Sequence, residues 1–558
     1  MKLVECVPNI SEGRRPEIYD AVAAAAAAVP GVTLLNVDPG AETNRTVITF
    51  VGAPDAVVEG AFQLIRKGIE LVDMTKHHGA HARMGAVDVV PFVPVAGISM
   101  DECAELARRL GERVGRELQI PIYLYEYAAS ADYRRNLAEV RAGEYEGLGA
   151  KFQDARWQPD FGPAKLLPRS GATAIGARKF LVAYNINLNT MDKRLANRVA
   201  FDIREKGRKK KDAAGNPVFD ASGAEVWEPG LLKAVKAVGW VIPEFGRAQI
   251  SMNLTDLDET PLHLAFDTCD DRARERGLRV TGSELVGLVP LSVLLDAGRH
   301  YLAKMGRPTG VPERELLQTA IRTLGLSEVK PFDPQELVIE YRLAAPAPLA
   351  AMPVRDFVDE LSSDSPAPGG GSVSALAASM GAALASMVAV LSHAKKGLEA
   401  KKDDFERIAR RGQELKKKLL DAVDADTAAF DRLLEAMRMP KETGDERAAR
   451  ARAMADATVY ASEVPLGVLE VCPEVIELCR EIGRSGLQAS LSDAGVGVQV
   501  ARAGTAGAYQ NVCINLKDLD DPRREDLLRR ADAAWERAKA LHAEGEAEIL
   551  TKLRESAR

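Results

Sequence analysis

The feature that most constrains the fold is a stripe at helical spacing between residues 404 and 439. Steps of three and four residues join ten positions, of which all but one are apolar or glycine. They are Phe405, Ile408, Gly412, Leu415, Leu419, Val423, Asp426, Phe430, Leu433 and Met437. An apolar stripe of this length must be covered by other helices. The pattern therefore predicts a long helix in an all-α bundle.

Asp426 is the exception, an ionisable residue on the apolar stripe. Asp421, Asp424 and Asp431 fall well outside the stripe by helical phase, and we expect them in solvent. Burying a carboxylate without partners is costly, so a core-facing aspartate either has its hydrogen bonds satisfied or transfers protons with a shifted pKa. The helix alone favours the first interpretation.

The chain changes character at residues 344–353, the Ala/Pro run AAPAPLAAMP. Before this run strands and helices alternate, and after it only helices are predicted. The run has no periodicity and is typical of a stiff spacer. The expected domains are residues 1–178, residues 179–343, a linker at 344–353 and an all-α domain at 354–558.

The first two domains share one order of elements, β-α-β-β-α-β. The predicted strands are residues 2–7, 32–37, 45–51 and 88–95 in the first, and 179–187, 233–241, 247–254 and 278–286 in the second; the helices are 15–29, 54–71, 190–206 and 260–276. Split β-α-β units of this kind form an antiparallel sheet with helices on one face. We expect a multidomain fold, two α+β ferredoxin-like subdomains with a cleft between them and then a helical bundle domain.

Composition excludes several classes of protein. The net charge of −7 argues against general nucleic-acid binding, and the six cysteines form no CxxC pair, so neither a disulfide framework nor a zinc knuckle is indicated. Charges in the initial MKLVECVPN are unlike a signal peptide, so a cytoplasmic protein is expected. Residues 365–392 contain no charged residue, but their Ala, Ser and Gly content predicts a buried helix rather than a membrane span.

Chemistry in the first half concentrates in residues 73–88, DMTKHHGAHARMGAVD. Three of the seven histidines, His77, His78 and His81, lie in this connection between a helix and a strand. Their spacing matches no tetrahedral metal site. Local evidence leaves catalysis and surface histidines as comparable interpretations.

Longer motifs carry a resemblance. VECVPNISEG at 4–13, VDPGAETNRTVITFVG at 37–52, KHHGAHARMGAVDVVPFVPV at 76–95 and DFGPAKLLPRSGATAIGARKFLVAYNINL at 160–188 resemble glutamate formimidoyltransferase. SPAPGGGSVSALAASMGAAL at 365–384, VDADTAAFDRLLEAMRMPK at 423–441 and SDAGVGVQVARAGTAGAYQNVCINL at 492–516 resemble formimidoyltetrahydrofolate cyclodeaminase. Their order is similar to that of the bifunctional family that joins the two enzymes.

The resemblance implies two steps of histidine degradation without a metal. The formimidoyl group of N-formimidoyl-L-glutamate passes to tetrahydrofolate, a co-substrate with a polyglutamate tail, and the product cyclises to 5,10-methenyltetrahydrofolate with loss of ammonia. In the first step a proton must leave the attacking nitrogen and reach the departing one, and the family's catalytic histidine corresponds to His81. The resemblance also implies a homo-oligomer formed through the helical domain.

Further residues are expected to bind substrate. Asp38 could stabilise positive charge near the formimidoyl carbon or simply form a turn, and Arg83 could pair with a substrate carboxylate or form a structural salt bridge. The resemblance assigns folate binding to a Gly/Pro loop made of Gly162, Pro163, Ala164, Lys165, Leu166, Leu167, Pro168, Arg169, Ser170 and Gly171.

In the second half the helical stripe and the resemblance agree on Asp426 as the catalytic aspartate. PAPGGGS, at the start of the uncharged segment 365–392, could bind an anion at the helix N-terminus or permit close packing, but it lacks the ending of a phosphate loop. Two alternatives stay open. One is a formyl-transferring or cyclohydrolase variant of the same family, and the other is a folate-binding protein without turnover.

Overall fold

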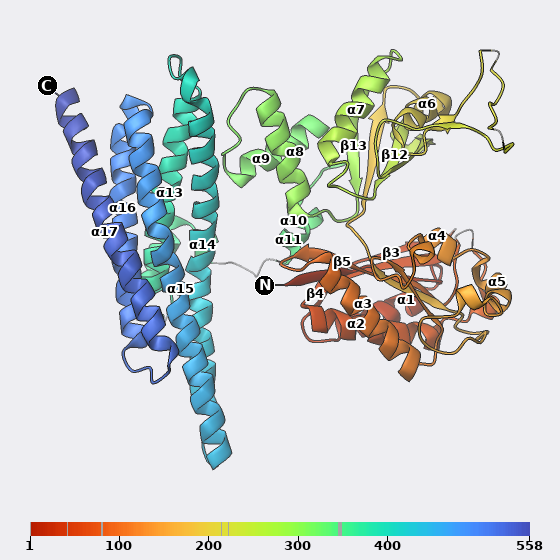
Figure 1. Ribbon diagram of the computed structural model, residues 1–558, viewed down its shortest axis with the longest axis horizontal. Coiled ribbons are helices and arrows are strands. Elements are labelled where there is room, and N and C mark those ends of the chain that lie inside the picture. Colours follow the sequence, from red (N-terminus) through yellow and green to blue (C-terminus); the bar gives the residue numbers. More distant parts are fainter. Residues whose placement is uncertain are drawn as a thin grey trace. The chain divides into compact units, whose positions relative to one another are not determined.

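The computed structural model describes residues 2–41, 43–79, 82–213, 215–220, 222–343, 349–365 and 367–557. The chain forms two compact units (Figure 1). We call Met1–Val293 with Leu324–Leu343 the sheet unit, and Leu294–Thr323 with Ala344–Arg558 the helical unit. Each unit is described by itself.

The first sheet contains the predicted elements in the predicted order. They are β1 (Leu3–Cys6), α1 (Pro16–Ala27), β3 (Val32–Gly40), β4 (Arg45–Gly52), α2 (Pro54–Leu71) and β5 (Val87–Ala96), with a short β2 (Asn9–Ile10) after β1. Strand β4 lies between β3 and β1, and β1 pairs with β5, all antiparallel. The apolar periodicity of the sequence was sufficient to place these elements within a few residues.

This sheet is larger than the sequence predicted. Beyond β5 it continues through β7 (Thr173–Ala177) to β6 (Ile122–Glu126), both parallel to their neighbours. The connecting helix α3 (Met100–Glu117) begins at a capping box, in which Ser99 and Glu102 bind each other's backbone N–H groups. Helices α1, α2 and α3 bury one face of the sheet in a single core. The short helices α4 (Leu137–Val140) and α5 (Glu144–Lys151) contribute to a second core, with Tyr123 and Tyr125.

The second sheet also has the predicted order of elements. It comprises β8 (Val182–Leu188), α6 (Lys193–Ile203), β11 (Val235–Ile242), β12 (Arg247–Leu254), α7 (Leu262–Arg274) and β13 (Val280–Val286). The four strands pair antiparallel in the order β11, β12, β8, β13. Between α6 and β11 the chain carries a short antiparallel pair of strands, β9 (Arg208–Lys209) and β10 (Trp227–Glu228).

The helical unit is built on five long helices, α13 (Gly370–His393), α14 (Lys402–Arg438), α15 (Gly444–Ser485), α16 (Leu491–Leu516) and α17 (Arg523–Ser556). They enclose one hydrophobic core. The helical unit also contains α12 (Val354–Leu361) and nearly all of α8 (Leu291–Lys304) and α9 (Glu313–Leu324). The short helices α10 (Pro334–Leu337) and α11 (Ile339–Arg342) belong to the sheet unit.

The segment Leu294–Thr323 belongs to the helical unit although it precedes the Ala/Pro run. Its Thr309 donates a backbone hydrogen bond of 2.9 Å to Glu406 of α14. At Gly310 the segment approaches α14 so closely that an added Cβ atom would lie 2.4 Å from backbone atoms of Ala409 and Arg410. This contact ties a piece of the middle of the chain to the bundle.

The apolar stripe of α14 is buried only along its first part. Phe405, Ile408, Leu415, Leu419 and Val423 are buried as predicted, whereas Phe430 is 37% exposed and Met437 is 44% exposed. Figure 1 shows that this end of α14 and the start of α15 extend beyond the other long helices. The periodicity predicted the helix correctly, but not how far the bundle covers it.

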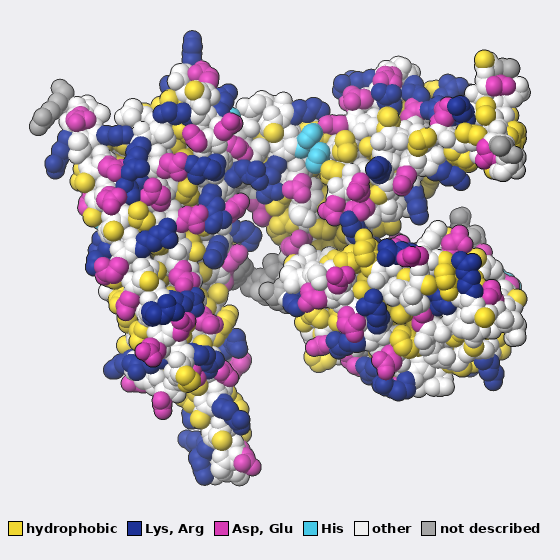
Figure 2. All heavy atoms as spheres, viewed as in Figure 1, with side chains coloured by type: hydrophobic (Ala, Val, Ile, Leu, Met, Phe, Trp, Pro, Cys, Tyr) yellow, Lys and Arg dark blue, Asp and Glu magenta, His cyan; other side chains and the backbone are white. Residues whose placement is uncertain are grey.

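Helix α13 is long and apolar enough to span a membrane by length and composition, and 56% of its most apolar window is buried. It packs against α14, α15 and α16 in the bundle, as expected for a core helix rich in small residues. Figure 2 shows Lys and Arg side chains mixed with Asp and Glu over the visible face of the helical unit.

Candidate functional sites

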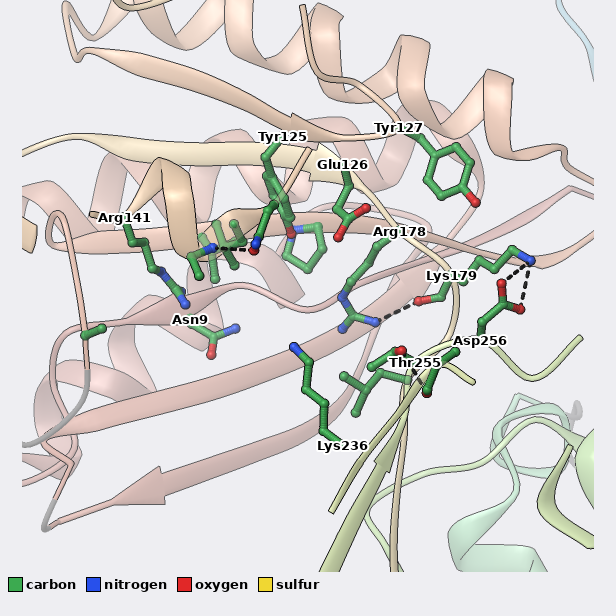
Figure 3. Close-up of a pocket in the computed structure, with 18 of the residues that line it drawn as sticks. Asn9, Tyr125, Glu126, Tyr127, Arg141, Arg178, Lys179, Lys236, Thr255 and Asp256 are labelled. Atoms are coloured by element: carbon green, nitrogen blue, oxygen red, sulfur yellow. Dashed lines mark hydrogen bonds and ion pairs between the residues drawn. The ribbon is translucent and has the colours of Figure 1, made fainter. Parts of the chain in front are cut away.

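A cavity of about 1010 Å³ lies in the sheet unit, lined by both sheets and their connections (Figure 3). The first sheet region contributes Asn9, Arg45, Tyr125, Glu126 and Arg141 among others, and the second contributes Lys233, Lys236, Thr255 and Asp256. The cleft expected between the two sheets is therefore present. Its size suits a drug-sized ligand.

Charged groups of both signs line this cavity. In Figure 3 the Arg178 side chain lies between Glu126 and Lys236, and it donates a 3.0 Å hydrogen bond to the carbonyl of Lys179. Burial raises the pKa of Glu126, whose backbone is left-handed at φ 52°. Burial also raises the pKa of Glu5 on β1 to about 7, and the positive charge of Arg178 opposes that rise. Two carboxyl groups near Arg178 thus hold protons more tightly than free carboxyls do.

The predicted catalytic residue His81 lies outside the described residues, and so does Ala80. The next residue, Ala82, lines the cavity. Among the described residues, no group of three or more His, Cys, Asp and Glu side chains is arranged to hold a metal ion.

His77 has a structural environment. It is buried, its Nε2 lies 2.8 Å from the carbonyl of Asn44, and its Nδ1 accepts a 3.3 Å hydrogen bond from Arg83. These partners fix a neutral ring with the proton on Nε2. Burial lowers the pKa of His77 and keeps it in this form. The His77 side chain therefore stabilises the histidine loop through its hydrogen bonds to Asn44 and Arg83.

Asn44 joins the loop to two other segments. Its own backbone is left-handed at φ 48°, its side chain accepts a hydrogen bond from the backbone N–H of Gly13 at 3.0 Å, and it donates one to the carbonyl of His78 at 3.1 Å. Three of the motifs that carry the resemblance thus converge on one residue.

Arg83 and Asp38 lie outside the lining of this cavity. The Arg83 side chain is 11% exposed, and its guanidinium group forms ion pairs with Glu144 at 2.9 Å and Glu146 at 2.6 Å. Asp38 was expected in a turn, but β3 continues through it to Gly40 and pairs it with Val47, so it is an exposed strand residue. The sequence pattern VDPG looks like a turn, and the pairing with β4 overrides that local preference.

The predicted folate-binding loop at 162–171 lies beside the histidine loop. Backbone hydrogen bonds of 2.9 Å run from Met74 to the carbonyl of Arg169 and from Ala86 to that of Ser170. The Arg169 side chain, 67% exposed, lies 3.8 Å from Asp73, and Lys165 and Leu166 are exposed. Two segments that the sequence indicated separately are therefore adjacent.

The helical unit presents a different site around Asp426. Its Oδ2 accepts hydrogen bonds from the backbone N–H of Ser372 at 2.9 Å and from the Ser372 hydroxyl at 3.1 Å. Ser372 lies in the first turn of α13, where backbone N–H groups favour an anion. Gly371 allows the approach, because an added Cβ atom would lie 2.1 Å from Oδ1 of Asp426. The anion at this helix terminus is thus the carboxylate of Asp426.

Burial raises the pKa of Asp426, and the two hydrogen bonds from Ser372 oppose the rise. Asp424, expected in solvent, is half-buried instead. Its carboxylate accepts a 3.4 Å hydrogen bond from the backbone N–H of Ala350, and burial raises its pKa as well. Both aspartates are thus half-buried, because residues 349–351 cover the flank of α14, which helical phase alone does not show.

Sequence reasoning missed several of the residues that build these sites. Glu126, Arg178 and Lys236 came from three separate segments, and only Arg178 lay in a motif that had been singled out, GARK. Ser372 was within PAPGGGS, which was interpreted as an anion site or a packing feature. Its partner could not be identified without the register of α13 against α14.

Comparisons with known proteins cover nearly the whole chain. Residues 3–178 match the model of the formiminotransferase domain, N-terminal subdomain, residues 183–344 match the formiminotransferase domain, and residues 353–533 match the formiminotransferase-cyclodeaminase model. The formimidoyltransferase-cyclodeaminase of Sus scrofa is 43% identical over 542 residues, 96% of this chain and 97% of that protein.

Two relatives each match one part of the chain. Glutamate formimidoyltransferase of Streptococcus pyogenes serotype M1 is 42% identical over 301 residues, 54% of this chain and 93% of that protein. Methenyltetrahydrofolate cyclohydrolase of Methylorubrum extorquens is 37% identical over 190 residues, 34% of this chain and 91% of that protein.

Proposed function

The chain belongs to the formimidoyltransferase-cyclodeaminase family, and we propose that it performs both reactions of that name on tetrahydrofolate. In the first, the formimidoyl group of N-formimidoyl-L-glutamate moves to N-5 of tetrahydrofolate and glutamate leaves. In the second, N-10 attacks the formimidoyl carbon, ammonia leaves and 5,10-methenyltetrahydrofolate forms. The first step is a transferase reaction and the second is a lyase reaction.

The transfer reaction is assigned to the sheet unit. His81 is the proposed general base and acid, and the described neighbour Ala82 at the cavity wall supports this place for it. Asp38, Arg83 and the loop at 162–171 are the proposed substrate-binding groups. Arg83 reaches a substrate carboxylate only by exchanging Glu144 or Glu146, so its proposed role requires a rearrangement of that ion pair.

Cyclodeamination is assigned to the helical unit, and one observation carries this assignment. Asp426 is a half-buried carboxylate whose pKa is raised by burial, and it is hydrogen-bonded by one residue at a helix N-terminus. A carboxyl group in this state can take the proton that N-10 loses and return it to the departing ammonia. Neither step requires a metal in this proposal.

Several finer assignments accompany this function. We propose that both sheet subdomains are ferredoxin-like, that domains meet near residues 178 and 343, and that residues 344–353 form the linker. The order β11, β12, β8, β13 supports the first of these for the second subdomain. We also propose a cytoplasmic enzyme of histidine degradation, without a membrane span, that uses polyglutamylated folate. The exposed Phe430 and Met437 support a homo-oligomer formed through the helical domain.

A steady-state assay that records glutamate, ammonia and methenyltetrahydrofolate together tests the proposal. Purified protein with N-formimidoyl-L-glutamate and tetrahydrofolate should release the three products in equal amounts. Tight folate binding without release of glutamate or ammonia would instead show a carrier protein.

The similarity to methenyltetrahydrofolate cyclohydrolase favours a second candidate for the helical unit. That enzyme name implies hydrolysis of methenyltetrahydrofolate, and a formyl donor would then replace the formimidoyl donor in the first step. Parallel assays with both donors separate the candidates, because only the formimidoyl donor yields ammonia.

A further inference from the structure

The hydroxyl of Ser372 has two acceptors but only one proton to donate. Its Oγ lies 3.1 Å from Oδ2 of Asp426 and 3.1 Å from the backbone carbonyl of Val423, one turn earlier on α14. Ser372 is fully buried. Since a serine hydroxyl donates a single hydrogen bond, only one of these two contacts is made at any moment.

We propose that Ser372 is a positioning residue whose hydroxyl changes its acceptor each time Asp426 gains or loses a proton. The inference rests on the proposed cyclodeaminase reaction. While Asp426 is ionised, the hydroxyl and the backbone N–H of Ser372 both donate to Oδ2. When the carboxyl is protonated, Oδ2 is a weaker acceptor and the hydroxyl turns to the carbonyl of Val423.

The arrangement leaves the other carboxyl oxygen for the chemistry. Oδ2 already has two donors from Ser372, whereas Oδ1 accepts no hydrogen bond from the described residues and faces Gly371, which has no side chain. The proton lost by the substrate nitrogen therefore goes to Oδ1, and from Oδ1 it passes to the departing ammonia. Only a hydroxyl rotation accompanies each transfer, so the backbone and the carboxyl group stay in place.

Charged neighbours play little part in this site. The first turn of α13 contains no ionisable residue, α16 presents the neutral Asn511 beside Gly370, and Asp424 on α14 binds Ala350 instead. Among the described residues, only burial and Ser372 shift the pKa of Asp426. Removing the hydroxyl should therefore change the titration of this carboxyl directly.

The chain offers a matched control on the same pair of helices. Ser386 of α13 is also fully buried, and its hydroxyl lies 3.1 Å from the carbonyl of Ala409 on α14. It differs from Ser372 in having no carboxylate among its partners; its remaining contacts are with Gly310 and Gln413. Ser386→Ala thus removes a comparable packing hydroxyl without touching a proton carrier.

The test is the pH profile of kcat for cyclodeamination of supplied 5-formimidoyltetrahydrofolate. In Ser372→Ala the loss of a hydrogen bond to the ionised form should move the acidic limb upward by about one pH unit and lower kcat about tenfold. Ser372→Thr keeps the hydroxyl and should restore the limb. Ser386→Ala should leave it unchanged. An unchanged limb in Ser372→Ala, or an equal shift in Ser386→Ala, overturns the inference.

A measurement without turnover separates this inference from the proposed function. The infrared band of the protonated Asp426 carboxyl, identified by its loss in Asp426→Asn, can be titrated in the full chain with and without the Ser372 hydroxyl. A midpoint that rises by about one pH unit in Ser372→Ala supports the inference even if the reaction is a different one, and an equal midpoint overturns it. Full activity of Asp426→Asn would refute the proposed function instead.

Discussion

The two units differ in the interactions that set the pKa values of their carboxyl groups. In the sheet unit, burial raises the pKa of Glu5 and of Glu126, which lines the charged cavity, and the positive charge of Arg178 opposes both rises. In the helical unit, burial also raises the pKa of Asp426, but only the hydrogen bonds from the uncharged Ser372, at the N-terminus of α13, oppose that rise.

This difference indicates how each site responds to its surroundings. Interactions between charges weaken as salt screens them, whereas hydrogen bonds from buried neutral groups do not depend on ionic strength in this way. Proton affinities in the sheet unit can thus be tuned by any neighbouring charge, including that of a substrate. The proton affinity of Asp426 depends instead on how well α13 and α14 are packed.

The largest expected effect is the complete loss of one activity while the other is kept. His81→Ala should abolish formimidoyl transfer, a loss of about 10³-fold or more, because both proton transfers of that step lose their carrier. Cyclodeamination of supplied 5-formimidoyltetrahydrofolate should be unchanged. Separate assays of the two reactions measure this, and an equal loss of both activities would show that the units do not act independently.

The next effect tests the proton carrier of the helical unit. Asp426→Asn keeps the shape of the side chain but removes the base, so cyclodeamination should fall at least about 10²-fold while transfer continues. Asp424→Asn is the control, because Asp424 binds the backbone of Ala350 and should matter far less. An inactive Asp424→Asn beside an active Asp426→Asn would reverse the roles assigned to them.

Glu5 tests the contribution of burial in the sheet unit. Its pKa is raised from 4.5 to about 7 in the folded protein, so its favourable effect is present below pH 4.5 and is lost as the pH rises through 7. Glu5→Gln should therefore raise the stability of the sheet unit by about 3 kcal/mol at pH 8 and by little at pH 4. Calorimetry of the full chain at both pH values measures the change. A variant that is destabilised at pH 8 would show that the ionised Glu5 is held favourably by Arg178.

The smallest effect concerns the approach of α13 to Asp426. In Gly371→Ala the new methyl group would meet the carboxyl oxygens, so the Asp426 side chain must move away from Ser372. We expect about a tenfold loss of cyclodeamination, as for other misplaced catalytic groups, with transfer unaffected. Steady-state kinetics of both reactions test this, and unchanged cyclodeamination would mean that the position of Asp426 is not critical.

The sequence predicted the longer strands and the helices between them. The strand β11 alternates between buried and exposed residues, whereas β4 and β5 are longer apolar runs that are buried over most of their length. The strands β6 and β7 were missed because they are apolar runs of only five residues without alternation, as in TAIGA of Thr173–Ala177.

The sites were predictable only one residue at a time. Asp426 stands out because a carboxylate interrupts an apolar stripe, but the contact with Ser372 joins residues 54 positions apart and depends on helix packing. The role of His77 likewise depends on Asn44, 33 positions earlier. The exposure of Phe430 could not be predicted either, since periodicity shows which face of α14 is apolar but not how far the other helices of the bundle cover that face.

The attachment of Leu294–Thr323 to the helical unit has a consequence for gene fission. The chain passes between the two units three times, at residues 293–294, 323–324 and 343–344. A gene divided within the Ala/Pro run would give two polypeptides that still share a folded interface, because Thr309 and Gly310 of the first would dock on α14 of the second. The segment Leu294–Thr323 would then hold the two polypeptides together by noncovalent contacts.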